Sequence, residues 1–200
     1  MTEELYLFDR NLIDLKSGTV AGVDEAGRGP LAGDVFAAAV ILDAKQMVEG
    51  LNDSKKLSHK QREMLFEDII NKSLAYAVAS ASVEEIEQMN ILGATILAMN
   101  RAIRKLEITP NIVLIDGNYS KGITYENIKV IKGDCKSASI AAASILAKVS
   151  RDRYMLEMAK KYPLYNFSKH KGYGTKEHIE AIKKYGICEI HRKKFCRKFI

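Results

Sequence analysis

Four acidic residues each follow a short apolar run, and these are the residues most able to do chemistry. They are Asp24, Glu25, Asp116 and Asp134. Short apolar runs predict buried strands, and the ends of strands are where α/β folds build their sites. Two like charges about 4 Å apart repel by roughly 4 kcal/mol at an effective dielectric near 20, so gathered carboxylates need a cation. Oxygen-only ligands favour Mg²⁺ or Mn²⁺ as that cation.

Each of these acids, taken alone, also has an ordinary structural interpretation. Asp134 could cap a following helix, Asp116 could lie in a turn, and Glu25 could pair with Arg28. Regular alternation along a strand would also send Asp24 and Glu25 to opposite faces. The glycines that follow predict that the strand already ends here, which would let both side chains converge. Four such acids together favour one shared site.

A glycine-rich segment follows the first acidic pair. Gly27 and Gly29 flank Arg28, and residues without a Cβ atom let main-chain groups approach a ligand closely. A P-loop would end in Gly-Lys-Ser/Thr, and the dinucleotide fingerprint needs a different glycine spacing, so we set both nucleotide sites aside. We therefore expect Gly27, Arg28 and Gly29 to meet a substrate through their backbone.

Further candidates place cations, hydroxyls or an aromatic ring where phosphate or sugar could bind. Lysines lie beside serines at 54–56 and 136–139, and the second segment opens a helix, where amides favour anions. A tyrosine between two glycines in the basic part of the chain could stack on a sugar or base. Ordinary caps, turns and core packing remain alternatives for all of them. The candidates are Lys55, Lys136, Ser137, Ser139 and Tyr173.

The elements that position these residues follow from apolar periodicity. Strands are expected over about 19–23, 35–42, 74–80, 112–115 and 128–131, the first two as a hairpin with a wide turn. Helices are expected over about 58–72, 82–106, 136–161 and 175–185. This order predicts an α/β fold with a mixed five-stranded sheet flanked by helices. We expect a single catalytic domain over 1–200, with a core at about 18–160 and a helical C-terminal lobe at 161–200.

The basic charge of the chain is concentrated near its C-terminus. Residues 160–200 contain 12 Lys and Arg against 3 Asp and Glu, a net of +9, whereas the whole chain has a net charge of +6. Such a block suits a polyanionic partner, because neutralised phosphates release counterions. A merely solvated lysine-rich surface is the alternative.

The remaining composition bears on location. The N-terminus is acidic where a signal peptide would be basic, and the apolar runs are too short to span a bilayer. The three cysteines form no CxxC pair, so we expect reduced thiols. We therefore expect a cytoplasmic protein without a membrane partner, and in the absence of a dimerisation seam we expect a monomer.

These motifs, taken together, resemble those of bacterial ribonuclease HII. The similar segments, in the family's order, are residues 22–33, 51–58, 114–117, 132–148 and 170–175. The resemblance runs from about Val20 to Phe195. Three positions depart from the family's usual pattern: Asp34 stands for proline, Asn166 for glycine and Lys194 for serine.

The resemblance implies a ribonuclease H-like fold in which the four acids bind two divalent ions, Mg²⁺ or Mn²⁺. It also implies that Gly27, Arg28 and Gly29 contact the ribose 2′-hydroxyl through backbone atoms, and that Tyr173 packs on the neighbouring sugar. The implied partners are RNA/DNA hybrids and DNA with embedded ribonucleotides. The implied activity is endonucleolytic hydrolysis on the 5′ side of a ribonucleotide, leaving a 3′-hydroxyl and a 5′-phosphate.

Two other functions fit part of the sequence. A nucleic-acid binding protein without chemistry would use the basic lobe alone, and it should bind equally well in EDTA. A ribonuclease H-like nuclease acting on DNA junctions would share the metal site but would not need the glycine segment. Cleavage of an all-DNA duplex, compared with cleavage of the same duplex carrying one ribose, distinguishes this DNA nuclease from a ribonuclease HII-like enzyme.

Overall fold

The computed structural model describes residues 2–16, 18–52 and 54–200. Its centre is a five-stranded sheet in the order β3-β2-β1-β4-β5. The strands are β1 (Val20–Ala26), β2 (Val35–Leu42), β3 (Ser73–Ala81), β4 (Ile112–Asp116) and β5 (Asn127–Val130). β1 pairs antiparallel with β2 and parallel with β4, so the sheet is mixed and the expected hairpin is confirmed.

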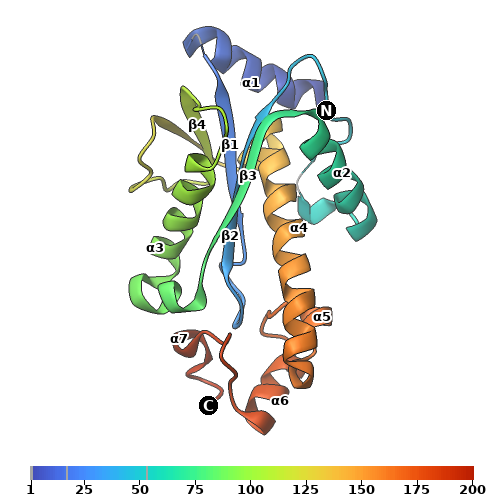
Figure 1. Cartoon of the computed structure of the whole chain (residues 1–200), viewed down its shortest axis with the longest axis vertical. Coiled ribbons are helices and arrows are strands. Elements are labelled where there is room, and N and C mark those ends of the chain that lie inside the picture. Colours follow the sequence, from blue (N-terminus) through green and yellow to red (C-terminus); the bar gives the residue numbers. More distant parts are fainter. Residues whose placement is uncertain (1, 17, 53) are drawn as a thin grey trace.

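Helices cover both faces of this sheet (Figure 1). The helices around the sheet are α1 (Thr2–Lys16), α2 (His59–Lys72), α3 (Val83–Arg104) and α4 (Ala138–Lys161). α3 packs on β2 and β3 at one face, whereas α4, with α2 beside it, packs on β1 and β2 at the other. Ser58 and Ser82 form the expected capping boxes, so the signals that begin α2 and α3 were interpreted correctly.

β1 and α4 lie unusually close together because small residues line their contact. Gly22 has no side chain at this point, and a Cβ atom added there would lie 2.1 Å from the Ser139 carbonyl carbon and 2.2 Å from the Ile140 nitrogen. Ala141, Ala142 and Ala143 of α4 are fully buried in the same layer. The backbone of α4 therefore packs directly against the backbone of β1, the strand that carries the first two acids.

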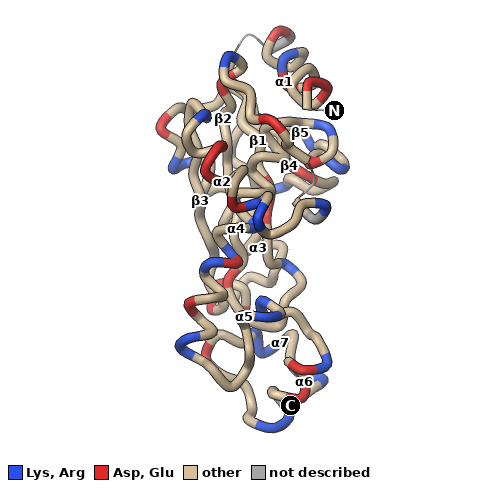
Figure 2. The backbone as a smooth tube through the Cα atoms, turned by 90° about the vertical axis from the view of Figure 1, so that its right-hand side faces the viewer, with Lys and Arg blue, Asp and Glu red and all other residues tan. Residues whose placement is uncertain are grey.

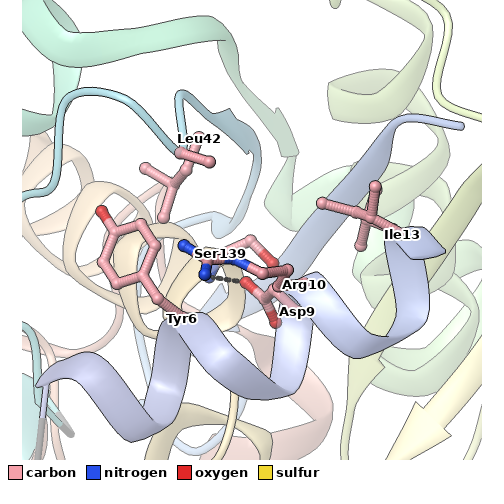
Figure 3. A pocket seen from close by; sticks show the side chains of 8 residues that line it. Tyr6, Asp9, Arg10, Ile13, Leu42 and Ser139 are labelled. Carbon is pink, nitrogen blue, oxygen red and sulfur yellow. Dashed lines mark hydrogen bonds between the residues drawn. The ribbon is translucent and has the colours of Figure 1, made fainter.

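Helix α1 was not expected from the sequence. It lies at the N-terminal end of α4, where Tyr6, Asp9 and Ile13 line a small pocket with Ser139 (Figure 3). Oδ2 of the buried Asp9 accepts a hydrogen bond from the Ser139 backbone N–H at 2.8 Å. Burial raises the pKa of Asp9, since the charged form loses its water. α1 therefore satisfies one of the amides that the first turn of α4 leaves unbonded.

The C-terminal lobe follows α4 and packs below the sheet (Figure 1). Its elements are a 3₁₀ turn (Pro163–Tyr165), α5 (Phe167–His170), α6 (Lys176–Tyr185) and α7 (Lys193–Cys196). Figure 2 shows Lys and Arg positions around α5, α6 and α7. The exposed basic residues from 169 onward are Lys169, Lys176, Lys183, Lys184, Lys193, Lys194, Arg197 and Lys198.

Two buried histidines of this lobe form a hydrogen-bonded series that ends at the Tyr173 carbonyl. The Cys188 backbone N–H donates to Nδ1 of His191 at 2.9 Å, which leaves the proton of a neutral His191 ring on Nε2. That atom lies 3.0 Å from Nε2 of His178, which therefore accepts, and Nδ1 of His178 donates to the Tyr173 carbonyl at 2.9 Å. This directed series of bonds requires both rings to be neutral.

The histidine pair predicts a loss of stability in mild acid. Burial lowers the pKa of His178 and of His191 to about 4, whereas both would titrate near 6.5 in the unfolded chain. The unfolded chain thus binds more protons between these values, so the contribution is complete above pH 6.5 and is lost as the pH falls towards 4. We expect the free energy of unfolding, measured in urea, to fall by on the order of 2 kcal/mol per histidine between pH 6.5 and 5.

The exposed His59 supplies the control for this prediction. His178→Gln should make the pH dependence of unfolding between pH 6.5 and 5 shallower, and by more than His59→Gln does. A wild-type free energy of unfolding that stays constant from pH 7 to 5 would contradict the assignment of neutral buried rings.

Candidate active site

A pocket lies where β1 and β4 end, beside the glycine-rich segment. Its lining residues are Asp24, Glu25, Ala26, Gly27, Arg28, Gly29, Ser54, Asp116, Ser144, Lys148 and Tyr173. It therefore brings together three of the four predicted acids, the whole glycine segment and the predicted tyrosine. These groups come from β1 and the segment after it, from β4 and from the C-terminal lobe, which only the tertiary fold can assemble.

The predicted break of the first strand after Val23 is wrong. β1 continues to Ala26, with Asp24 opposite Ala38 and Glu25 opposite Ala37 on β2. Ala38 belongs to the core layer under α4, and Ala37 belongs to the layer under α3. Strand alternation therefore directs Asp24 and Glu25 to opposite faces.

Glu25 points towards the α3 side and forms an ion pair with Arg28, with Oε1 at 3.2 Å from Nη1. The ion pair that was the alternative interpretation of Glu25 is therefore present. Because the pair is at the edge of the pocket and Arg28 is half exposed, it contributes little to stability. Breaking this ion pair therefore costs little free energy, so another cation could replace Arg28 beside Glu25.

Asp24 is the most constrained of the acids. It is buried, and its Oδ1 accepts the Glu25 backbone N–H at 2.7 Å, while its carboxylate also bonds to the Ser144 hydroxyl. Ser144 in turn lies 2.8 Å from the Ser54 hydroxyl. Burial, and then the charges of Glu25 and Asp116, hold the pKa of Asp24 well above its ordinary value. A positive charge supplied to this position would relieve all three effects.

A hydrogen bond joins Asp116 to the residue that precedes Asp134. Asp116 ends β4, and its Oδ1 accepts the Gly133 backbone N–H at 2.6 Å. Asp134 follows on the 3₁₀ turn Gly133–Cys135 and is buried, but it does not line the pocket. The cap of α4 is Ser137, whose hydroxyl accepts the Ile140 N–H at 3.2 Å, so Asp134 is not that cap.

Among the described residues, no three His, Cys, Asp or Glu side chains lie close enough to hold a metal ion as they stand. Alternation on β1 and the pairing of Glu25 with Arg28 account for this spread. The donor chemistry nevertheless fits a hard divalent cation, because every candidate ligand is a carboxylate oxygen. If Glu25 were to hold such an ion, it would have to release Arg28.

The other predicted contacts divide into two groups. Tyr173 is 43% exposed, and a Cβ atom at Gly29 would lie 3.9 Å from its ring, so Tyr173 lies over the glycine segment rather than in the core. Lys136 is exposed outside the pocket, whereas Ser137 and Ser139 are buried with their hydroxyls 3.1 Å apart. The side chain of Lys55 lies outside the described part of the structure.

Three polar pocket residues were not among the predicted site residues. Ser54, Ser144 and Lys148 line the pocket, and Nζ of Lys148 pairs with Oδ1 of Asp152 at 2.7 Å. Ser144, Lys148 and Asp152 are four residues apart on α4, so one helix face carries them all. That spacing was the signal that could have identified Ser144 and Lys148.

The three departures from the usual pattern lie away from the acids. Asn166 takes a left-handed φ of 52°, which asparagine tolerates. Asp34 accepts the Val83 N–H at 3.2 Å and lies 3.4 Å from the Tyr154 hydroxyl. Lys194 bonds to Glu87 through both its backbone N–H and its ammonium group.

Comparison with known proteins decides the family. The family model described as Ribonuclease HII matches residues 21–198, nearly the whole chain. The chain belongs to the ribonuclease HII family. Ribonuclease HII of Caldicellulosiruptor bescii is 55% identical over 99% of this chain and 96% of its own length. Ribonuclease HII of Endomicrobium trichonymphae is 57% identical over 98% of this chain and 93% of its own length.

Solved structures agree with this family. The crystal structure of ribonuclease H2 from Pyrococcus horikoshii OT3 has a TM-score of 0.74 and 32% identity, covering 90% of this chain and 96% of that one. The structure of the PCNA:RNase HII complex from Archaeoglobus fulgidus also has a TM-score of 0.74, with 26% identity over 87% of this chain and 93% of that one. The expected ribonuclease H-like fold is confirmed, and membership of the ribonuclease HII family makes the chain a ribonuclease H-type hydrolase. Across the described residues, no helix is both long and apolar enough to cross a bilayer.

Proposed function

We propose that this protein is an endoribonuclease that cuts the RNA strand of RNA/DNA hybrids and cuts on the 5′ side of ribonucleotides embedded in duplex DNA. The products are a 3′-hydroxyl and a 5′-phosphate. Asp24, Glu25, Asp116 and Asp134 would hold two divalent ions, Mg²⁺ or Mn²⁺. The protein would act in the cytoplasm as a monomer.

One observation carries this proposal. A single pocket contains three carboxylates and the backbone of Gly27–Gly29, with the exposed ring of Tyr173 over the same segment. Carboxylates suit a cation-assisted attack on phosphate, whereas a backbone segment can recognise a hydroxyl without selecting a base. A protein that only binds nucleic acid gains nothing from carboxylates directed at phosphates, which they repel.

The roles of the chain's own residues follow from their positions. The chemistry that bound ions supply is activation of the attacking water and stabilisation of the leaving 3′ oxygen. Ser144 and the Glu25 N–H fix the Asp24 carboxylate, and the Gly133 N–H fixes Asp116, so both are already oriented. Lys148 adds a positive charge beside them for a backbone phosphate. The glycine segment and Tyr173 select ribose on the adjacent side.

A cleavage assay with four conditions tests the proposal. The substrates are an RNA/DNA hybrid, a DNA duplex with one ribonucleotide and the same duplex without it, each with Mg²⁺, and the second also with EDTA. We expect cleavage of the first two substrates only, and only with Mg²⁺. Cleavage of the all-DNA duplex at a similar rate would favour a DNA-junction nuclease instead. Binding without cleavage, equal with and without EDTA, would favour the pure binder.

A further inference from the structure

A buried arginine of the C-terminal lobe lies directly behind the glycine-rich loop, here defined as residues 27–33. Arg192 has no exposed surface, and its guanidinium donates five hydrogen bonds, all to backbone carbonyls of this loop. The acceptors are the carbonyl oxygens of Gly27 at 2.6 Å, Arg28 at 2.9 Å, Pro30 at 2.9 Å and Gly33 at 2.7 and 2.9 Å. The backbone N–H of Arg192 donates to a fifth loop carbonyl, that of Leu31, at 2.8 Å.

A second buried arginine supports the loop from α4. Arg151 donates to the carbonyls of Ala32 and Asp34, each within 3.2 Å, and a Cβ atom at Gly27 would collide with its Nε at 2.0 Å. Neither Arg151 nor Arg192 forms an ion pair with a described residue. The carboxylate of Asp34 is nevertheless near enough to interact electrostatically with both. Burial lowers the pKa of Arg192 to about 9, so it stays charged at neutral pH. Carbonyl dipoles therefore carry most of the compensation for these two charges.

The direction of these carbonyls determines where the loop's N–H groups point. The described peptide bonds are all trans, so a C=O and the N–H of the next residue point in opposite directions. The Gly27 carbonyl faces Arg192, so the Arg28 N–H faces away from it. By the same geometry, the Arg28 carbonyl fixes the Gly29 N–H. Both residues line the pocket, so two consecutive donors are held on its side of the loop.

We propose that Arg192 is a positioning residue for ribose recognition, because it orients the Arg28 and Gly29 amides by binding the carbonyls behind them. Its planar group makes five bonds in fixed directions, and no other side chain can reproduce this set. The C-terminal lobe thereby contributes to substrate selection through a residue that does not touch substrate. This inference rests on the proposed function, in which the glycine loop recognises the 2′-hydroxyl.

Binding to two duplexes that differ by one 2′-hydroxyl tests this role. The parent is an Asp24→Asn protein, which should bind without cutting, and fluorescence anisotropy with Mg²⁺ gives its Kd for each duplex. The ratio of the two dissociation constants measures ribose discrimination. We expect Arg192→Lys to reduce this ratio at least 5-fold while changing the Kd for the all-DNA duplex less than 2-fold. Arg197→Lys, at an exposed arginine of the same lobe, should leave the ratio unchanged.

The outcomes separate positioning from a merely structural role. Arg192→Gln, which loses the charge but retains donors, provides a second variant and should also reduce the ratio. An unchanged ratio in a folded Arg192 variant would overturn the proposal. Failure of both variants to fold would overturn it too, since Arg192 would then be required by the whole fold. A parent that binds both duplexes equally would contradict the proposed function itself, before any change at Arg192.

Discussion

Asp24→Asn should reduce the rate of cleavage by at least about 100- to 1000-fold with saturating Mg²⁺. Asp24 is buried in the pocket, and its carboxylate bonds to the Glu25 backbone N–H and the Ser144 hydroxyl. Asparagine has nearly the same shape, but it replaces one of the proposed ligand oxygens with an NH₂ group and removes the negative charge. The measurement is single-turnover cleavage of a duplex with one ribonucleotide.

The same change should stabilise the metal-free protein by about 1–2 kcal/mol. Asp24→Asn removes a buried charge that Glu25 and Asp116 repel. Unfolding in urea with EDTA measures this gain, and Mg²⁺ should stabilise the wild type more than the variant. Asp14→Asn, at an exposed position of α1, should change neither activity nor stability. A variant that is less stable without metal, or that retains near wild-type cleavage, would contradict the assigned role of Asp24.

Gly22→Ala should destabilise the fold by about 3 kcal/mol or more. The added methyl group would lie about 2 Å from the backbone of Ser139 and Ile140, and backbone at the start of a helix cannot move aside as a flexible side chain can. β1 and α4 would have to separate, and this would also displace Asp24 from Ser144. Urea unfolding of the purified variant at pH 7 measures the effect.

Gly29→Ala provides the matched control for this substitution. Its Cβ atom would meet only the Tyr173 ring at 3.9 Å, an ordinary contact distance, so stability should stay within about 0.5 kcal/mol of the wild type. Equal stabilities of the two variants would show that the close approach of β1 and α4 is not required.

The fold was predictable largely because its signals are local. Two capping boxes located α2 and α3, and β-branched runs located the strands of the sheet. Helix α1 was missed, although Leu5, Phe8 and Leu12 recur at helical spacing before the first strand.

Part of the pocket was predictable as a set of residues, but its geometry was not. Strand ends indicated the acids, and the structure gathers Asp24, Glu25 and Asp116 in one pocket. The strand break predicted from the glycines does not occur, because the pairing of β1 with β2 outweighs the local preference of glycine for a break. The support from Arg192 was equally inaccessible, since its partners lie about 160 positions earlier in the chain. Such contacts carry no signature in a single sequence.

Helix α4 has a consequence for how this protein can change over evolution. Ser144, Lys148, Arg151 and Asp152 lie on this one uninterrupted helix of 24 residues, about 36 Å long. One residue inserted before Ser144 would rotate all four by about 100° around the helix axis. Their side chains would then no longer contact the acids or the glycine-rich loop. Surface loops can therefore vary in length among descendants, whereas this helix can vary only in composition.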